Sequence, residues 1–141
     1  FSYGLACNLT NQIAAIGSVA GTMISDTYEN CYATVPKPMI NIHGANDPIV
    51  PYEGAQGLIS IRNVLDFWSK LNLATDIETN FFEGVENYVY KDSVGTPLVS
   101  HFKINNGVHT WDYNSLLSNN MKTNELIWEF VSKFDINGYI E

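Results

Sequence analysis

The stretch that decides the fold is PMINIHGANDPIVP, residues 38–51. Its first half is a continuous apolar run that ends at Gly44. Such runs are typical of strands covered on both faces of a parallel sheet. Asp47 follows soon after, in a turn that Gly44 permits and Pro48 stiffens. The stretch therefore predicts a buried strand with an ionisable side chain just beyond its end.

Periodicity predicts the other elements. A second apolar run, residues 13–20, predicts another buried strand. Apolar residues at helical spacing predict amphipathic helices at 58–72 and near 122–134, the latter with Thr123 as a possible N-cap. Residues 76–82 are strand-like, and residues 86–91 and 98–104 flank a turn at 93–97, which indicates a hairpin or two adjacent strands. We expect residues 1–141 to form one domain of α/β class, with parallel strands and flanking helices.

Composition excludes two classes of partner. The chain has 141 residues, with 7 Lys and Arg against 15 Asp and Glu, a formal charge of −8. So few basic residues do not form the positive surface that nucleic acid requires. No stretch approaches the roughly 20 consecutive apolar residues of a transmembrane helix. We therefore expect neither a nucleic-acid nor a membrane partner.

Cys7 and Cys31 are the two cysteines of the chain. They are too few for a cysteine-based metal site. Two interpretations stay open from the residues alone: two buried thiols that pack as small apolar groups, or one disulfide. A disulfide would favour an exported protein.

Asp47 and His109 are the candidate catalytic residues. His109 follows the last predicted strand and comes soon after Gly107, whose missing side chain allows a substrate or a neighbouring loop to approach. In a hydrolytic triad a carboxylate orients the imidazole that takes the proton of the nucleophile. The order acid then base fits the order Ser, Asp, His. The alternatives are an ordinary Asp-Pro turn and an ordinary hydrogen-bonded histidine.

The other candidates are weaker. His43 and His101 lie within predicted strands, which favours structural roles, and the three histidines lack the paired spacing of zinc motifs. We therefore expect no metal and no cofactor. The chain has no G-x-S-x-G, since Ser18 stands one place too early in Gly17–Gly21. The residues alone leave the triad without its nucleophile.

The chain resembles a known family, the polyhydroxybutyrate depolymerase and feruloyl-esterase-like branch of the α/β-hydrolases. The resemblance is carried by the segments at 2–7, 13–23, 43–54, 107–111 and 124–130, among them His43-Gly44, Asp47-Pro48-Ile49-Val50-Pro51 and His109-Thr110-Trp111. The chain departs from the family pattern around the histidine, with Gly107-Val108 before it and Trp111-Asp112-Tyr113 after it. The resemblance implies an α/β-hydrolase sheet of which this chain is the C-terminal portion, with the N-terminal half absent.

The resemblance also implies roles for particular residues. The nucleophilic serine would stand five positions before Phe1, together with the oxyanion hole, and Ser2 is the rival nucleophile if a glycine precedes Phe1. Asp47 and His109 would be acid and base, and Trp111 would line the substrate cleft. Cys7 would pair with Cys31, and the protein would be secreted. The implied parent is a serine esterase, and the isolated chain would be inactive.

Two expectations concern partners and a second class of function. A sheet lacking half its strands would leave an exposed edge and apolar surface, through which the chain would pair with itself or with the missing half. The alternative to an esterase acting on an ester substrate is a non-catalytic binding or interaction module that kept the fold.

Overall fold

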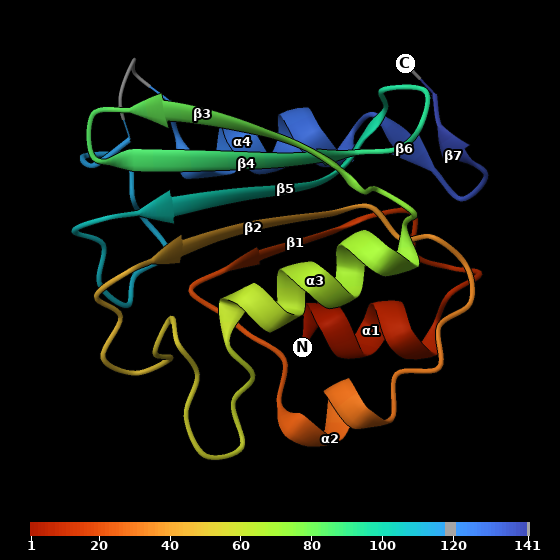
Figure 1. The fold of residues 1–141 in the computed structure, drawn as a ribbon, viewed down its shortest axis with the longest axis horizontal. Helices are drawn as coiled ribbons and strands as arrows, with labels where there is room; N and C mark the ends of the chain where they lie inside the picture. The colour runs from red at the N-terminus through yellow and green to blue at the C-terminus, as the bar shows by residue number, and fades with distance from the viewer. Residues whose placement is uncertain (118–120, 141) are drawn as a thin grey trace.

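A five-stranded mixed sheet forms the centre of the molecule (Figure 1). The structure is a computed structural model and describes residues 1–117 and 121–140. The sheet has the order β1-β2-β5-β4-β3. The strands are β1 (Ile16–Val19), β2 (Met39–Gly44), β3 (Asp76–Phe82), β4 (Val85–Lys91) and β5 (Pro97–Ile104). Strands β1, β2 and β5 run parallel, whereas β4 and β3 are added antiparallel beside β5.

The predicted fold class, an α/β-hydrolase sheet of parallel strands with flanking helices, is wrong. The sheet has two parallel pairs and two antiparallel pairs, and helices make up 23% of the chain. The physical reason lies in the turns after residue 82. Gly84 and Gly95 adopt the left-handed conformation, with φ of +74° and +90°, and each permits a short reversal between neighbouring strands. No helical crossover is needed there, so this half of the sheet is an antiparallel meander.

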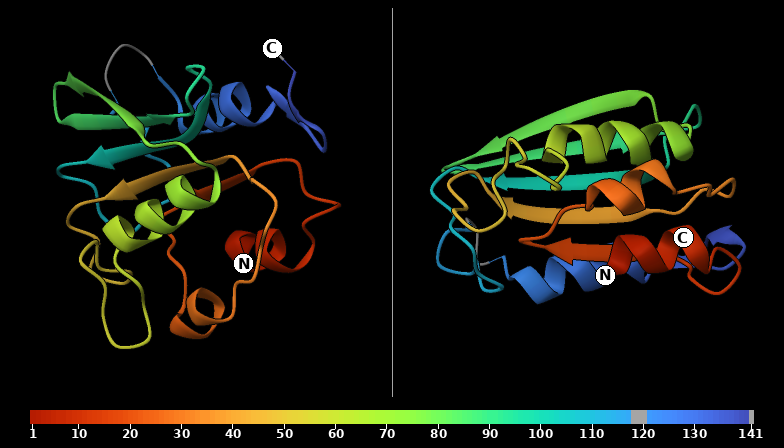
Figure 2. Two further views of the ribbon diagram at one scale, coloured as in Figure 1. Left: turned by 45° about the vertical axis from the view of Figure 1, so that its right-hand side comes forward. Right: turned by 90° about the horizontal axis from the view of Figure 1, so that it is seen from below.

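Helices cover both faces of the sheet (Figure 2). They are α1 (Ser2–Asn8), α2 (Ser25–Glu29), α3 (Ile61–Leu71) and α4 (Thr123–Val131), and a small hairpin of β6 (Phe134–Asp135) and β7 (Gly138–Tyr139) follows α4. Helices α1 and α3 pack on one face, where Trp68 is fully buried. Helix α4 packs on the other face through Phe130. None of the helices among the described residues is long and apolar enough to cross a bilayer.

Strand β2 is buried along its whole length. Met39 belongs to the core on the α3 face, while Ile40 and Ile42 belong to the core on the α4 face. This two-sided burial is the environment that the apolar run predicted. It also means that β2 emerges from the core at Gly44, directly before the loop that carries Asp47.

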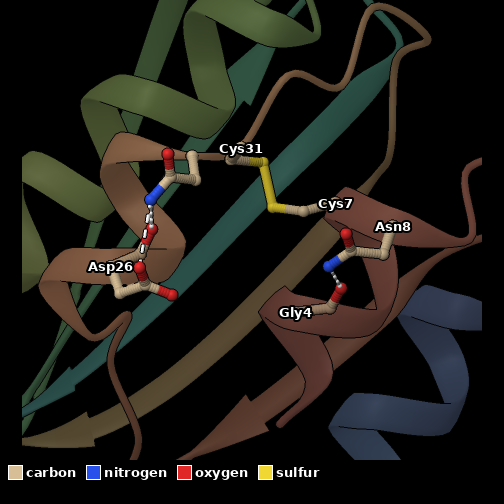
Figure 3. The surroundings of a disulfide bond; sticks show 6 residues. Gly4, Cys7, Asn8, Asp26 and Cys31 are labelled. Carbon is tan, nitrogen blue, oxygen red and sulfur yellow. Dashed lines mark hydrogen bonds between the residues drawn. A yellow bond between two sulfur atoms is a disulfide. The ribbon is translucent and has the colours of Figure 1, made fainter.

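A disulfide joins Cys7 to Cys31, with the two Cα atoms 5.1 Å apart (Figure 3). It confirms the pairing implied by the family resemblance. The bond ties the C-terminal turn of α1 to the segment that follows α2. Asn8 and Asn30 close the ends of these two helices by donating to the carbonyls of Gly4 and Asp26, at 2.8 and 3.0 Å. The bond therefore fastens two short helices that have little core of their own.

Candidate active site

Two loops meet at the carboxyl edge of the parallel strands, one after β2 and one after β5 (Figure 1). Because β2 and β5 are parallel neighbours, their carboxyl ends lie side by side. Backbone hydrogen bonds join the loops: Ala45 N–H donates to the carbonyl of Ile104 at 2.8 Å, and Asn46 N–H donates to that of Gly107 at 3.0 Å. The sheet thus fixes the relative position of both loops.

The loops touch through two glycines. A Cβ placed on Gly44 would lie 2.3 Å from the carbonyl oxygen of Gly107, and one placed on Gly107 would lie 2.8 Å from Gly44 Cα. Both contacts are with backbone, which cannot move aside as a side chain can. The neighbouring loop is therefore the group that approaches Gly107, and this contact requires glycine on both sides.

Asp47 and His109 are brought together by this arrangement. Asp47 Oδ2 accepts a hydrogen bond from His109 Nδ1 at 2.9 Å. The other carboxylate oxygen, Oδ1, accepts from the backbone N–H groups of Ile49 and Val50 at 2.9 and 2.8 Å. Burial opposes ionisation of Asp47, but the Val50 N–H, the His109 ring and the Ile49 N–H outweigh it, so its pKa falls below the ordinary value. Asp47 is therefore a buried carboxylate held in one orientation.

The contact with Asp47 sets the tautomer of His109. An ionised carboxylate only accepts, so Nδ1 carries the hydrogen and Nε2 of the neutral ring has a free lone pair. The side chain of His109 is 40% exposed, and Nε2 has no hydrogen-bond partner among residues 1–117 and 121–140. Such an imidazole can accept a proton from a hydroxyl presented at the sheet edge.

Tyr113 is a residue of the site that the sequence analysis missed. Its side chain is fully buried, and its hydroxyl accepts from Gly44 N–H at 3.1 Å and donates to the carbonyl of Val108 at 2.7 Å. Burial raises the pKa of Tyr113, so the hydroxyl stays protonated and both bonds persist. The hydroxyl therefore links the loop of Asp47 to the loop of His109. Its one sequence signal is an aromatic residue four places after the histidine, which carries no specificity.

His43 holds the Asp47 loop through a hydrogen bond to the backbone of that loop. Its Nε2 lies 2.8 Å from the carbonyl of Val50, to which it donates, and 3.5 Å from Asp47 Oδ2. The ring is fully buried, and burial lowers its pKa, which keeps it neutral. His43 thus holds the backbone that in turn holds Asp47.

His101 lies in the sheet and takes no part in the pair. Tyr52 O–H donates to its Nε2 at 2.8 Å, and its Nδ1 donates to the carbonyl of Asn41 at 3.2 Å. Burial lowers the pKa of His101 to about 3. In the part of the chain that the structure describes, no three His, Cys, Asp or Glu side chains are grouped so as to hold a metal ion.

The remaining candidates lie outside the contact between the two loops. Trp111 is 60% exposed, and its indole N–H donates to Asn124 Oδ1 at 2.9 Å, which directs it to the start of α4. Its role in lining a cleft stays a prediction. Ser2 is the first residue of α1, and Ser18 Oγ donates to the carbonyl of Gly21 at 3.4 Å.

No protein-family model matches this sequence, and no curated protein matches it at significant similarity. The chemical interpretation of the site therefore rests on its own geometry.

Proposed function

We propose that Asp47 and His109 are the acid and base of a serine carboxylic-ester hydrolase. The observation that carries the proposal is the 2.9 Å contact between Asp47 Oδ2 and His109 Nδ1, with the opposite ring nitrogen left open to solvent. A buried carboxylate on one side of an imidazole and an accessible nitrogen on the other are what the proton transfer of a triad requires. The resemblance to polyhydroxybutyrate depolymerases and feruloyl esterases supports the same reaction class.

The reaction runs in two halves. A serine hydroxyl attacks the ester carbonyl while His109 Nε2 takes its proton, and Asp47 stabilises the imidazolium that forms. The same proton then passes to the leaving alcohol, which departs and leaves an acyl-enzyme. In the second half, water gives a proton to His109 Nε2 and attacks the acyl carbonyl, and the proton returns to the serine as the carboxylic acid is released.

The serine of this proposal precedes Phe1. Helix α1 runs opposite to the parallel strands, so that its first residue faces the edge from which the loops of Asp47 and His109 emerge (Figures 1 and 2). A residue five positions before Phe1 on a continuation of this helix would lie about 7.5 Å further toward that edge. Ser2 is the rival nucleophile, at the start of the same helix.

The disulfide supports an exported protein, because such bonds persist in oxidising compartments. The edge strand β1 supports the proposed pairing with a preceding segment or with a second copy. It is hydrogen-bonded to β2 on one side and ends the order of the sheet on the other. An open strand edge is a template for another strand.

A second candidate function is a binding module without catalysis. The observation in its favour is that no hydroxyl among residues 1–117 and 121–140 forms a hydrogen bond with His109 Nε2. In that case the Asp47–His109 pair would be structural.

The deciding experiment is labelling with a fluorophosphonate, which reacts with activated serines. The coding sequence before Phe1 is read first, and the protein that it specifies is labelled and digested for mass spectrometry. We expect one labelled serine in a G-x-S-x-G turn before Phe1, and no label when His109 is changed to Ala. Label on Ser2 would identify Ser2, in place of an upstream serine, as the nucleophile. Absence of any label would favour the binding module.

A further inference from the structure

A groove lies on the α3 face of the hairpin formed by β3 and β4. Its volume is about 310 Å³, near the lower end for small-molecule sites. Tyr88 and Tyr90 of β4 form its floor, and Arg62 and Leu65 of α3 form one wall. Tyr52, from the loop that follows β2, also lines the groove. The size suits a single six-membered ring with its substituents.

The floor of the groove is held in place by the sheet. Tyr88 stacks on the buried ring of His101, with their centroids 6.1 Å apart and the planes inclined by 18°. Tyr52 is fixed by its hydrogen bond to the same histidine. The aromatic surfaces are thus preorganised, which lowers the entropic cost of binding a ring.

Arg62 is the free cation of the groove. It is the one arginine of a chain with 15 acidic residues, and no carboxylate pairs with it among residues 1–117 and 121–140. Asp66, one helical turn further on, is bound to Lys70 at 2.7 Å. Lys103, the other cation of the groove, pairs with Glu86 at 3.4 Å and lies 5.5 Å from the centre of the Tyr52 ring. A guanidinium without a partner, beside tyrosines, is suited to bind a carboxylate through its fork of N–H donors.

The other groups of the groove are suited to hydroxyls. Glu53 supplies acceptors, and Thr79 supplies a hydroxyl that donates and accepts. Tyr90 O–H has no partner among the described residues, and burial raises its pKa, so that it remains a donor. A polyhydroxylated ring can form hydrogen bonds with these groups, whereas the ring of an aromatic acid cannot.

We propose that this groove binds a uronic acid, a pyranose ring that carries a carboxylate. The carboxylate pairs with Arg62, the C–H face of the ring lies on the tyrosines, and the hydroxyls bond to Glu53 and Thr79. Binding here does not depend on ester hydrolysis, so this proposal and the proposed function can fail separately.

The test is a titration of the ¹⁵N-labelled chain, followed by amide chemical shifts. The probes are sodium D-galacturonate, D-galactose and sodium benzoate at constant ionic strength. We expect saturable shifts at Arg62, Tyr88 and Tyr90 with galacturonate, and affinity at least about tenfold weaker for galactose and benzoate. Arg62→Gln should weaken galacturonate binding by about tenfold or more. The matched control is Lys122→Gln, which removes one positive charge at the start of α4 and should leave the affinity unchanged.

Four results would overturn the proposal. Equal affinity for galactose and galacturonate would mean that the carboxylate of the ligand does not contribute to binding. Tighter binding of benzoate than of galacturonate would mean that the hydroxyls of the ligand do not contribute. Shifts that do not saturate, or that persist unchanged in Arg62→Gln, would mean that the groove is not the site. Galacturonate binding by the ¹⁵N-labelled chain, combined with no fluorophosphonate label on the protein that includes the sequence before Phe1, would support the groove while removing the proposed function.

Discussion

Asp47 Oδ2 lies 2.9 Å from His109 Nδ1, although 62 positions separate the two residues along the chain. The contact exists because β2 and β5 are parallel neighbours and end at the same edge. Two glycines let their loops touch, and the hydroxyl of Tyr113 bonds to both. The glycines and the Tyr113 hydroxyl can each be changed by substitution. Each substitution should alter the contact between Asp47 and His109 in a different way.

Asp47→Asn should lower the kcat of the proposed esterase by about 10⁴, the order found for the carboxylate of a triad. The amide cannot accept from Nδ1 in the same way, so His109 loses its tautomer and the support of its imidazolium. The measurement is hydrolysis of p-nitrophenyl butyrate by the protein labelled above. The control is Asp112→Asn, an exposed carboxylate three residues beyond His109. Turnover within a few fold of wild type would remove Asp47 from the mechanism.

Tyr113→Phe should lower the free energy of unfolding by about 1–3 kcal/mol, because the buried N–H of Gly44 loses its partner. It should also loosen the His109 loop, since Val108 loses the hydrogen bond that it accepts. Urea denaturation measures the first effect. Proton NMR of the His109 Nδ1–H measures the second as a weaker, more rapidly exchanging signal. Tyr139→Phe, at a half-exposed ring on β7, should change neither measurement. If the His109 signal is unaltered in Tyr113→Phe, the hydroxyl does not position the pair.

The sequence predicted the local elements of this fold, and the turn at 93–97 indicated a hairpin or adjacent strands, but the strand directions of the sheet as a whole were predicted wrongly. The apolar run before Gly44 and the helical spacing around Trp68 are local signals, and the structure has β2 and α3 at those places. The direction of a strand relative to the sheet depends on which strand lies beside it. The alternation of apolar and polar residues along a strand carries no information on which strand is its neighbour. Asp47 could be singled out because it follows a buried strand. Tyr113 could not be singled out, because its role depends on a turn that brings its hydroxyl to the N–H of Gly44.

Gly107→Ala should destabilise the protein and disturb the pair together. The added Cβ would lie 2.8 Å from Gly44 Cα and 2.9 Å from the Tyr113 ring, so one loop must move. We expect a lower urea midpoint and loss of the His109 Nδ1–H signal. Gly4→Ala is the control, because no atom lies within 4 Å of its added Cβ and alanine favours the α1 helix by up to about 1 kcal/mol. Equal stability of wild type and Gly107→Ala would show that the loops have room between them.

Removal of the disulfide should lower the free energy of unfolding by about 3.5 kcal/mol, the chain-entropy value for a closed loop of this length. The variant carries Cys7→Ser and Cys31→Ser together, so that no free thiol remains. Guanidinium denaturation measures the change, with reduced wild-type protein as the comparison. Because the bond lies at the far end of α1 from Phe1, the His109 Nδ1–H signal should be retained. Unchanged stability of the double variant would mean that the bond does not restrain the unfolded chain.

His101 should make stability fall as the pH is lowered through the range 6 to 4.5. Burial lowers its pKa to about 3 in the folded protein, against an ordinary value of 6.5. Between these values the unfolded chain binds a proton that the folded protein does not, so each unit of acidification favours unfolding by up to about 1.4 kcal/mol. His101→Gln removes this group, and the slope of unfolding free energy against pH should decrease by up to one proton. His43 is present in both proteins, so its contribution cancels in the difference. Val99→Ala, at a buried neighbour on the same face of β5, should lower stability by a similar amount at each pH and leave the slope unchanged. Parallel curves for wild type and His101→Gln would mean that His101 takes up its proton in the folded protein as readily as in the unfolded chain.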